Sequence, residues 1–241
     1  MQTFEFIIPG EMSANPGPNP YAAPVDDAEP ERLAAAAVGY RDQGTRLSIV
    51  AMLLGLYSLT ILASMWSCMA ANGVVPAVFA VLEPRDIGTQ GPDVLFVVSN
   101  TVYLMCAAGI GAFLVRANHN ARRLGGPDHG MTTSPGWTVG WFFIPFANWV
   151  RPYRAVKEIW MVSQPDRSGP LPIWWALWLI TSLGGRIADK ISERAETWDE
   201  IIRSNWLNFA HNGFAIAAAL AVFLVVRGLH ENQQQHASAL S

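Results

Sequence analysis

The sequence predicts an all-α integral membrane protein, and three observations lead to this fold class. The 241-residue chain is 51% hydrophobic. Only 15% of its residues are charged, whereas a soluble domain usually carries about 25%. The apolar residues also fall into long uncharged blocks, which the core of a soluble protein does not need. Because backbone groups in lipid must be hydrogen-bonded internally, we expect these blocks to form a helical transmembrane bundle.

Two tails are expected to flank a transmembrane domain at residues 31–230. Residues 1–30 are rich in Pro, Gly, Asn and Ala and are predicted to be disordered, because their prolines prevent regular structure. Phe4–Ile8 is too short for the apolar core of a signal peptide, so no cleaved signal is expected. A short alanine-rich helix is expected from about Asp27 to Arg46. The polar tail at 231–241 is also predicted to be disordered.

Four segments are predicted to cross the membrane, at about residues 47–70, 94–115, 171–188 and 206–226. The first, second and fourth contain no charged residue, and about 20 apolar residues are enough to cross the hydrocarbon layer. The third reaches Ala188 only if Arg186 extends its charged group toward the membrane surface.

A fifth apolar stretch, residues 137–150, is aromatic and uncharged but contains only 14 residues. That length is typical of a buried or re-entrant segment, and Pro145 breaks helical hydrogen bonding. We therefore expect a proline-broken, half-inserted segment. An interfacial helix at 152–163 should follow it, because proline is favoured in a first helical turn.

The interfacial helix is expected to lie in the plane of the lipid headgroups. Its predicted apolar face consists of Tyr153, Val156, Ile159 and Trp160. Three basic residues point elsewhere and are expected to contact anionic lipid headgroups, namely Arg151, Arg154 and Lys157. Tryptophans often mark the membrane surface, and the predicted interfacial anchors are Trp137, Trp141, Trp149, Trp160, Trp174, Trp175 and Trp178.

Residues 186–203 show the pattern of a separate amphipathic helix. Its apolar stripe contains Ile187, Ile191, Trp198 and Ile202. Its acidic stripe contains Asp189, Glu193, Glu196 and Glu200. A solvated face is favoured over a metal site here, because nearby lysine and arginine side chains partly neutralise the acidic stripe and no histidine supports it.

The basic residues favour one orientation of the chain. If residues 137–150 do not cross, both termini lie on one side, with eleven basic residues there and five on the opposite side. If they do cross, the division is ten to six. Since basic residues concentrate in the cytoplasm, we expect four crossings of the cell membrane with cytoplasmic termini. An arrangement with five crossings stays open.

The sequence lacks the common catalytic signatures, including the phosphate-binding loop, the dinucleotide glycine motif and the metalloprotease motif. Its net charge of −3 gives no reason to expect nucleic-acid binding. The two cysteines, Cys68 and Cys106, lie in apolar runs without the spacing of a metal site. We therefore expect neither an enzyme nor a bound metal or cofactor.

Two groups of polar residues are candidates for a functional site. The first is Pro145, Asn148 and Pro152, where a broken helix could expose carbonyls to a ligand, as in transporters. An architectural role, in which Asn148 satisfies the freed carbonyls, is the alternative and is favoured. The second group is Asn208, His211 and Asn212. If Asn100 and Tyr103 face this group, the five residues would form a polar cluster inside the bundle. Polar groups inside a membrane are often functional, but a hydrogen bond between helices is the simpler explanation.

The segment Trp141–Trp160 and the later pattern Trp174-Trp-Ala-Leu-Trp178 with Gly185-Arg-Ile187 resemble a bacterial family called domain of unknown function 4328. The resemblance covers roughly residues 45–230 and rests on the spacing of Pro145, Asn148 and Pro152. It implies a multi-pass bacterial membrane protein and no established activity. Two functions are therefore considered: a non-enzymatic membrane module that acts through partners or lipids, and a small transporter or channel with its site at the broken segment.

Overall fold

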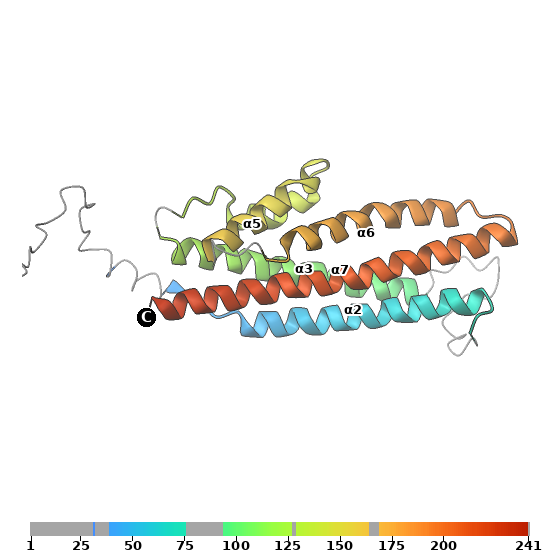
Figure 1. Cartoon of the computed structure of the whole chain (residues 1–241), viewed down its shortest axis with the longest axis horizontal. Helices are drawn as coiled ribbons and strands as arrows, with labels where there is room; N and C mark the ends of the chain where they lie inside the picture. The colour runs from blue at the N-terminus through green and yellow to red at the C-terminus, as the bar shows by residue number, and fades with distance from the viewer. Residues whose placement is uncertain (1–30, 32–38, 76–93, 127–128, 164–168, 241) are drawn as a thin grey trace, which may run out of the picture.

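The computed structural model describes residue 31 and residues 39–75, 94–126, 129–163 and 169–240, and every regular element in these ranges is helical. The predictions for the tail at 1–30 and for most of the alanine-rich helix lie outside the described residues. Four long helices run side by side along the molecule (Figure 1): α2 (Gly44–Ala71), α3 (Val94–Leu124), α6 (Leu171–Ser192) and α7 (Trp198–Ala239).

The chain reverses direction at each of these long helices. α7 packs most extensively against α6 and α2, and α2 packs against α3. α3 and α7 end beside the start of α2, at what we call the hairpin end of the bundle (Figure 1). The opposite end holds the last turn of α2 and the connection at residues 193–197, and we call it the turn end. Small residues allow this close packing; a methyl group on Gly109 of α3 would lie 3.2 Å from Leu53 of α2.

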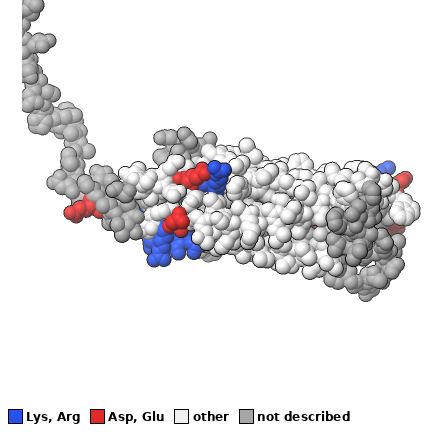
Figure 2. Space-filling model, turned by 90° about the horizontal axis from the view of Figure 1, so that it is seen from below, with Lys and Arg blue, Asp and Glu red and all other residues white. Residues whose placement is uncertain are grey.

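Three helices are long and apolar enough to cross a membrane, namely α2, α3 and α7. The predicted third span, α6, is not among them, because its tryptophans and Arg186 lower its mean hydropathy. Figure 2 agrees with a membrane placement, since the middle of the molecule lacks charged side chains in that view and the charges gather toward its ends.

Two helices extend further than the sequence predicts. α3 continues to Leu124, beyond the predicted span at 94–115, because residues in its last turns are buried against the rest of the bundle. α7 continues to Ala239, so the prediction of a disordered tail is wrong for residues 231–239. This polar end stays helical because one side of it is buried, including Gln233.

The separate amphipathic helix predicted at 186–203 is also wrong. Its first half completes α6, which ends at Ser192, and its second half begins α7 at Trp198. Thr197 separates the two helices with a capping box, in which its hydroxyl accepts a hydrogen bond from the Glu200 amide and the Glu200 carboxylate accepts one from the Thr197 amide. Residues Glu193, Glu196 and Glu200 are exposed, as expected for a solvated face.

A hairpin of short helical segments connects α3 to α6 and lies along one side of the bundle, nearer the hairpin end (Figure 1). It contains α4 (Pro135–Gly140), two 3₁₀ turns, η2 (Trp141–Phe143) and η3 (Ala147–Trp149), and α5 (Arg151–Ser163). The central stretch is therefore broken near Pro145, as predicted, and α5 matches the helix expected at 152–163.

Candidate functional site

The tip of this hairpin is the most unusual surface of the molecule. The Ala147 amide donates a hydrogen bond to the Pro145 carbonyl at 2.7 Å, which closes a three-residue turn centred on Phe146. Phe146 has a φ of 62°, a conformation that is uncommon and strained for a bulky residue. Phe146 is 83% exposed, and Phe143 is 80% exposed. The turn therefore holds two large apolar rings away from the protein.

Other apolar residues of the hairpin are also exposed. Trp137, Trp149 and Val150 are about half exposed, at 50%, 51% and 46%. We call Trp137, Phe143, Phe146, Trp149 and Val150 the aromatic tip. A contiguous exposed apolar surface usually marks a contact with a membrane or a partner. Two of the predicted interfacial tryptophans, Trp137 and Trp149, are thus placed where an anchor could act.

The tryptophans of α6 have a different role from the predicted one. Trp174 and Trp175 are buried, at 5% and 9% exposure. Trp175 stacks on Trp178 with ring centroids 4.7 Å apart, and Tyr153 of α5 lies 6.0 Å from Trp175. The prediction that Trp174 and Trp175 form an aromatic belt in lipid is wrong, because they pack inside the protein.

The same stack fixes the height of the hairpin along α6. Phe142 of η2 meets Trp178 edge-on, with centroids 5.8 Å apart. Trp178 is the eighth residue of α6, so η2 lies about 10 Å along that helix from its start, at about 1.5 Å per residue. The hairpin therefore returns alongside the bundle and does not extend beyond its end.

The apolar face of α5 was expected to meet lipid, and this prediction is also wrong. Val156, Ile159 and Trp160 are 0%, 0% and 4% exposed because they pack on the bundle. Trp160 fills a notch in α7 at Gly228, where an added methyl group would lie 2.6 Å from the indole ring. Trp160 is consequently a packing residue and not an interfacial anchor.

The basic residues of α5 remain at the surface, as predicted. Arg151 lies over the Trp141 ring at 5.2 Å from its centroid, which leaves Trp141 half buried. Arg154 and Lys157 are exposed, and among the described residues neither has an ion-pair partner. They border an open hollow of about 330 Å³ that is mainly apolar and includes Met131 and Met161.

The carboxylate of Glu158 binds the segment before α4 and, among the described residues, forms no ion pair with these cations. It accepts hydrogen bonds from the amides of Thr132 and Thr133 at 3.1 and 2.9 Å and from the Thr132 hydroxyl. Burial by itself raises the pKa of Glu158, but these hydrogen bonds outweigh burial and lower the pKa. Glu158 therefore ties α5 to the segment before α4 in its charged form.

The predicted polar residues of α3 and α7 do not meet in one site. Asn100 is exposed and donates to the Phe96 carbonyl of its own helix. Tyr103, also on α3, contacts Tyr57 of α2, with ring centroids 5.8 Å apart. On the other side of the bundle, Asn208 donates to the Ser192 hydroxyl of α6 at 3.0 Å.

His211 also faces α6, where Gly184 and Gly185 leave room for its ring; methyl groups there would lie 3.4 and 3.3 Å from it. Asn212 is partly buried beside it. Asn148 lies in the hairpin, and its side-chain oxygen is buried with no partner among the described residues. An amide oxygen can only accept a hydrogen bond, so this atom cannot be the one that satisfies a freed carbonyl, and the architectural role of Asn148 stays a prediction.

A buried polar cluster at the hairpin end was missed by sequence reasoning. Gln43 donates to the Gln233 side-chain oxygen at 3.0 Å, and Gln233 donates to the Ala117 carbonyl at 2.8 Å. The Asn120 side chain accepts a hydrogen bond from the Arg41 amide at 3.3 Å and donates one to the Arg41 carbonyl at 2.8 Å. These side chains are fully buried. The only signal in the sequence was glutamine and asparagine close to uncharged spans, which by itself does not indicate contact.

No cluster of three or more histidine, cysteine, aspartate or glutamate residues that could hold a metal occurs among the described residues. Comparison with known proteins identifies a family instead. The family model described as "Domain of unknown function (DUF4328)" matches residues 93–231, more than half of the chain.

The chain belongs to this family. The match begins just before α3, so the first helix, α2, lies outside it, although the sequence resemblance was expected to start near residue 45. The matched region includes the whole hairpin and the Trp160–Gly228 contact. No curated protein and no solved structure matches the chain.

Proposed function

We propose that this protein is a non-enzymatic membrane module whose hairpin inserts its aromatic tip into one leaflet and binds anionic lipid headgroups. The observation that carries the proposal is the outward display of Phe143 and Phe146 on a strained turn. Burying one such side chain contributes about 1.5–3 kcal/mol. Insertion into lipid would offset both the strain and the exposure.

The charges of α5 support the same placement. Arg151, Arg154 and Lys157 lie on the exposed side of the helix that follows the tip. Each basic residue near an anionic membrane surface contributes about 1 kcal/mol. The tip would then lie below the phosphates and the three cations would lie level with them.

The proposal includes four crossings, by α2, α3, α6 and α7, with both termini in the cytoplasm. The alternation of direction among the four helices supports this arrangement (Figure 1). α6 is the one of the four that lacks a stretch apolar enough to cross by itself, but it packs extensively against α7. The hairpin end, which carries most of the basic residues, would face the cytoplasm.

Transport is a second candidate, supported by the polar residues that α7 presents to α6, namely Asn208 and His211. It is the weaker candidate, because Asn100 and Asn148 lie elsewhere and do not extend this polar surface across the bundle.

A spin-label experiment tests the insertion of the tip. With Cys68 and Cys106 replaced by alanine, a label at Phe143→Cys is placed in lipid nanodiscs, with Glu196→Cys as the matched exposed control. We expect the label at position 143 to be relaxed by oxygen and shielded from a water-soluble nickel complex, and the control to show the reverse. Equal access of the nickel complex to both sites would contradict insertion.

A further inference from the structure

A second group of basic side chains lies at the hairpin end, on the boundary between α2 and α3 and away from the cations of α5. Arg116, His119 and Arg123 follow one another on a single face of α3, at spacings of three and four residues. Arg46 lies in the first turn of α2, and Arg41 precedes that helix. We call these five residues the basic seam.

Hydrogen bonds within the bundle hold the members of the seam together. The Asn120 side chain, between His119 and Arg123, is bonded to both the amide and the carbonyl of Arg41. The Arg123 guanidinium donates to the Gly39 carbonyl. The segment that carries Arg41 is therefore fixed against the last turns of α3.

Helix geometry places Arg46 and Arg116 at nearly the same level. Gly109 of α3 lies against Val50 and Leu53 of α2. Arg46 is four residues before Val50, and Arg116 is seven residues after Gly109 in the antiparallel helix. At about 1.5 Å per residue, the two arginines lie about 6 and 10 Å beyond this contact on the same side.

Electrostatics agree with this proximity. Burial lowers the pKa of Arg116, and the positive charges of Arg46, Arg41 and Arg123 lower it further. Burial also lowers the pKa of His119, with further contributions from Arg116, Arg123 and Arg122. The nearby carboxylate of Asp42 accepts a hydrogen bond from the Gly44 amide at the start of α2. Four arginines thus share a surface with one described carboxylate.

We propose that the basic seam is a binding site for the headgroup of an anionic phospholipid that carries two phosphates. Both uncharged spans end at the seam, since Arg46 precedes Leu47 and Arg116 follows Val115. The next turn of α2 exposes Ile49 and Met52, at 45% and 67%, so acyl chains would find an apolar surface directly beside the arginines. Arginine suits phosphate because it can donate two parallel hydrogen bonds.

A lipid rather than a soluble anion is favoured by this position. A single phosphate would leave part of a four-arginine surface uncompensated, whereas two linked phosphates would bridge α2 and α3. The site is independent of the hairpin proposal, because the seam and α5 share no basic residue.

Native mass spectrometry of the full chain in detergent tests the proposal, with cardiolipin titrated against phosphatidylglycerol at equal phosphate concentration. We expect cardiolipin to bind at least tenfold more tightly. The variant Arg116→Gln/Arg123→Gln should lose at least tenfold in cardiolipin affinity. The matched control is Lys190→Gln/Arg194→Gln, which makes the same change in charge on exposed residues near the turn end and should stay within twofold of the wild type.

A second variant, Arg116→Lys/Arg123→Lys, guards against misfolding because it keeps the charge; it should show an intermediate loss at an unchanged melting temperature. The proposal is overturned if the seam variants bind cardiolipin as the wild type does, or if phosphatidylglycerol binds equally well. Full competition by inorganic pyrophosphate would also overturn it, because the site would then prefer a soluble anion. An equal loss of cardiolipin affinity in the control variant at the turn end would overturn it as well, because the effect would then follow net charge and not the seam.

Discussion

At the scale of single residues, the docking of α5 depends on a glycine in the helix that it packs against. Trp160 is buried because Gly228 of α7 leaves a notch for its indole ring. Phe146 shows the opposite case, since it keeps a strained backbone while its ring remains exposed. Packing inside the molecule explains the first residue, whereas for the second the proposed insertion into lipid supplies the explanation.

We predict that Gly228→Ala destabilises the protein. Overpacking of a filled core usually costs about 1–3 kcal/mol, while the gain in helix propensity is about 1 kcal/mol. The matched control is Gly213→Ala on the same helix, where an added methyl group meets nothing within 4 Å. Thermal unfolding in detergent should show a lower melting temperature for Gly228→Ala only. A melting temperature at or above that of the control would show that Trp160 does not depend on the missing side chain at Gly228.

At the scale of elements, α5 shows how a helix can have two separate contacts. Its apolar face packs on α7 and α3, and its polar side holds the segment before α4 through Glu158. Hydrophobic periodicity identified the apolar face correctly. It did not reveal that protein, and not lipid, covers that face, because both environments select the same side chains.

Because hydrogen bonds lower the pKa of Glu158 in the folded protein, its contribution to stability is fully present above the unfolded pKa, near 4.5. That contribution is lost as the pH falls through the lower folded value. We predict that Glu158→Gln removes this part of the acid sensitivity. Melting temperatures measured from pH 7 to 3 should fall less steeply for this variant than for the wild type.

The exposed glutamate Glu196 provides the control for that series. Glu196→Gln should follow the wild-type curve, because its side chain lies at the turn end, away from α5. Parallel curves for Glu158→Gln and the wild type would show that the hydrogen bonds to Thr132 and Thr133 do not stabilise the charged form.

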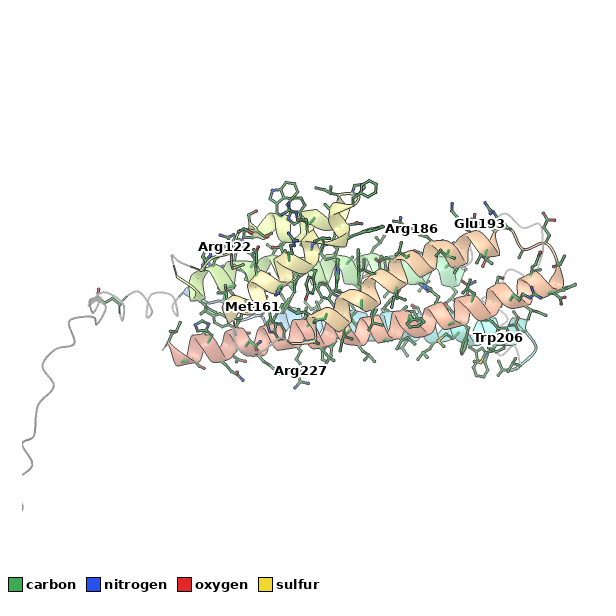
Figure 3. The ribbon with its side chains drawn as sticks, turned by 45° about the horizontal axis from the view of Figure 1, so that its top comes forward. Arg122, Met161, Arg186, Glu193, Trp206 and Arg227 are labelled. Carbon is green, nitrogen blue, oxygen red and sulfur yellow. The ribbon has the colours of Figure 1, made fainter. Side chains whose placement is uncertain are left out.

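At the scale of the whole molecule, the charges and the helix directions define two ends. Figure 3 shows Arg122, Met161 and Arg227 toward the hairpin end and Glu193 and Trp206 toward the turn end. The proposed topology therefore assigns each connection between the long helices to one side of the membrane. The hairpin leaves and rejoins the bundle at the same end if it does not cross.

We predict that reporters inserted at Gly126, at Gly169 and after the last residue give a cytoplasmic signal. A reporter inserted at Glu196 should give an extracytoplasmic signal. Opposite signals at Gly126 and Gly169 would show instead that residues 137–150 cross the membrane, which is the arrangement with five crossings.

Much of the architecture could be predicted from the chain alone. The positions of α2, α3 and α7, the break near Pro145 and the start of α5 follow from hydropathy and proline chemistry, which act locally. The ends of α3 and α7 did not follow, because buried contacts such as Gln43 with Gln233 join residues 190 positions apart. The boundary between α6 and α7 was missed for a different reason: the Thr197–Glu200 capping box is a local signal that the amphipathic pattern concealed.

The sequence by itself indicated a membrane environment, because uncharged apolar runs of about 20 residues are long enough to cross the hydrocarbon layer. It also determined where the broken, aromatic segment falls, since proline removes a backbone donor wherever it occurs. Tertiary structure alone decided which tryptophans are buried, which rings point outward and which arginines meet. These outcomes depend on distances between separate helices, which no single stretch of sequence encodes.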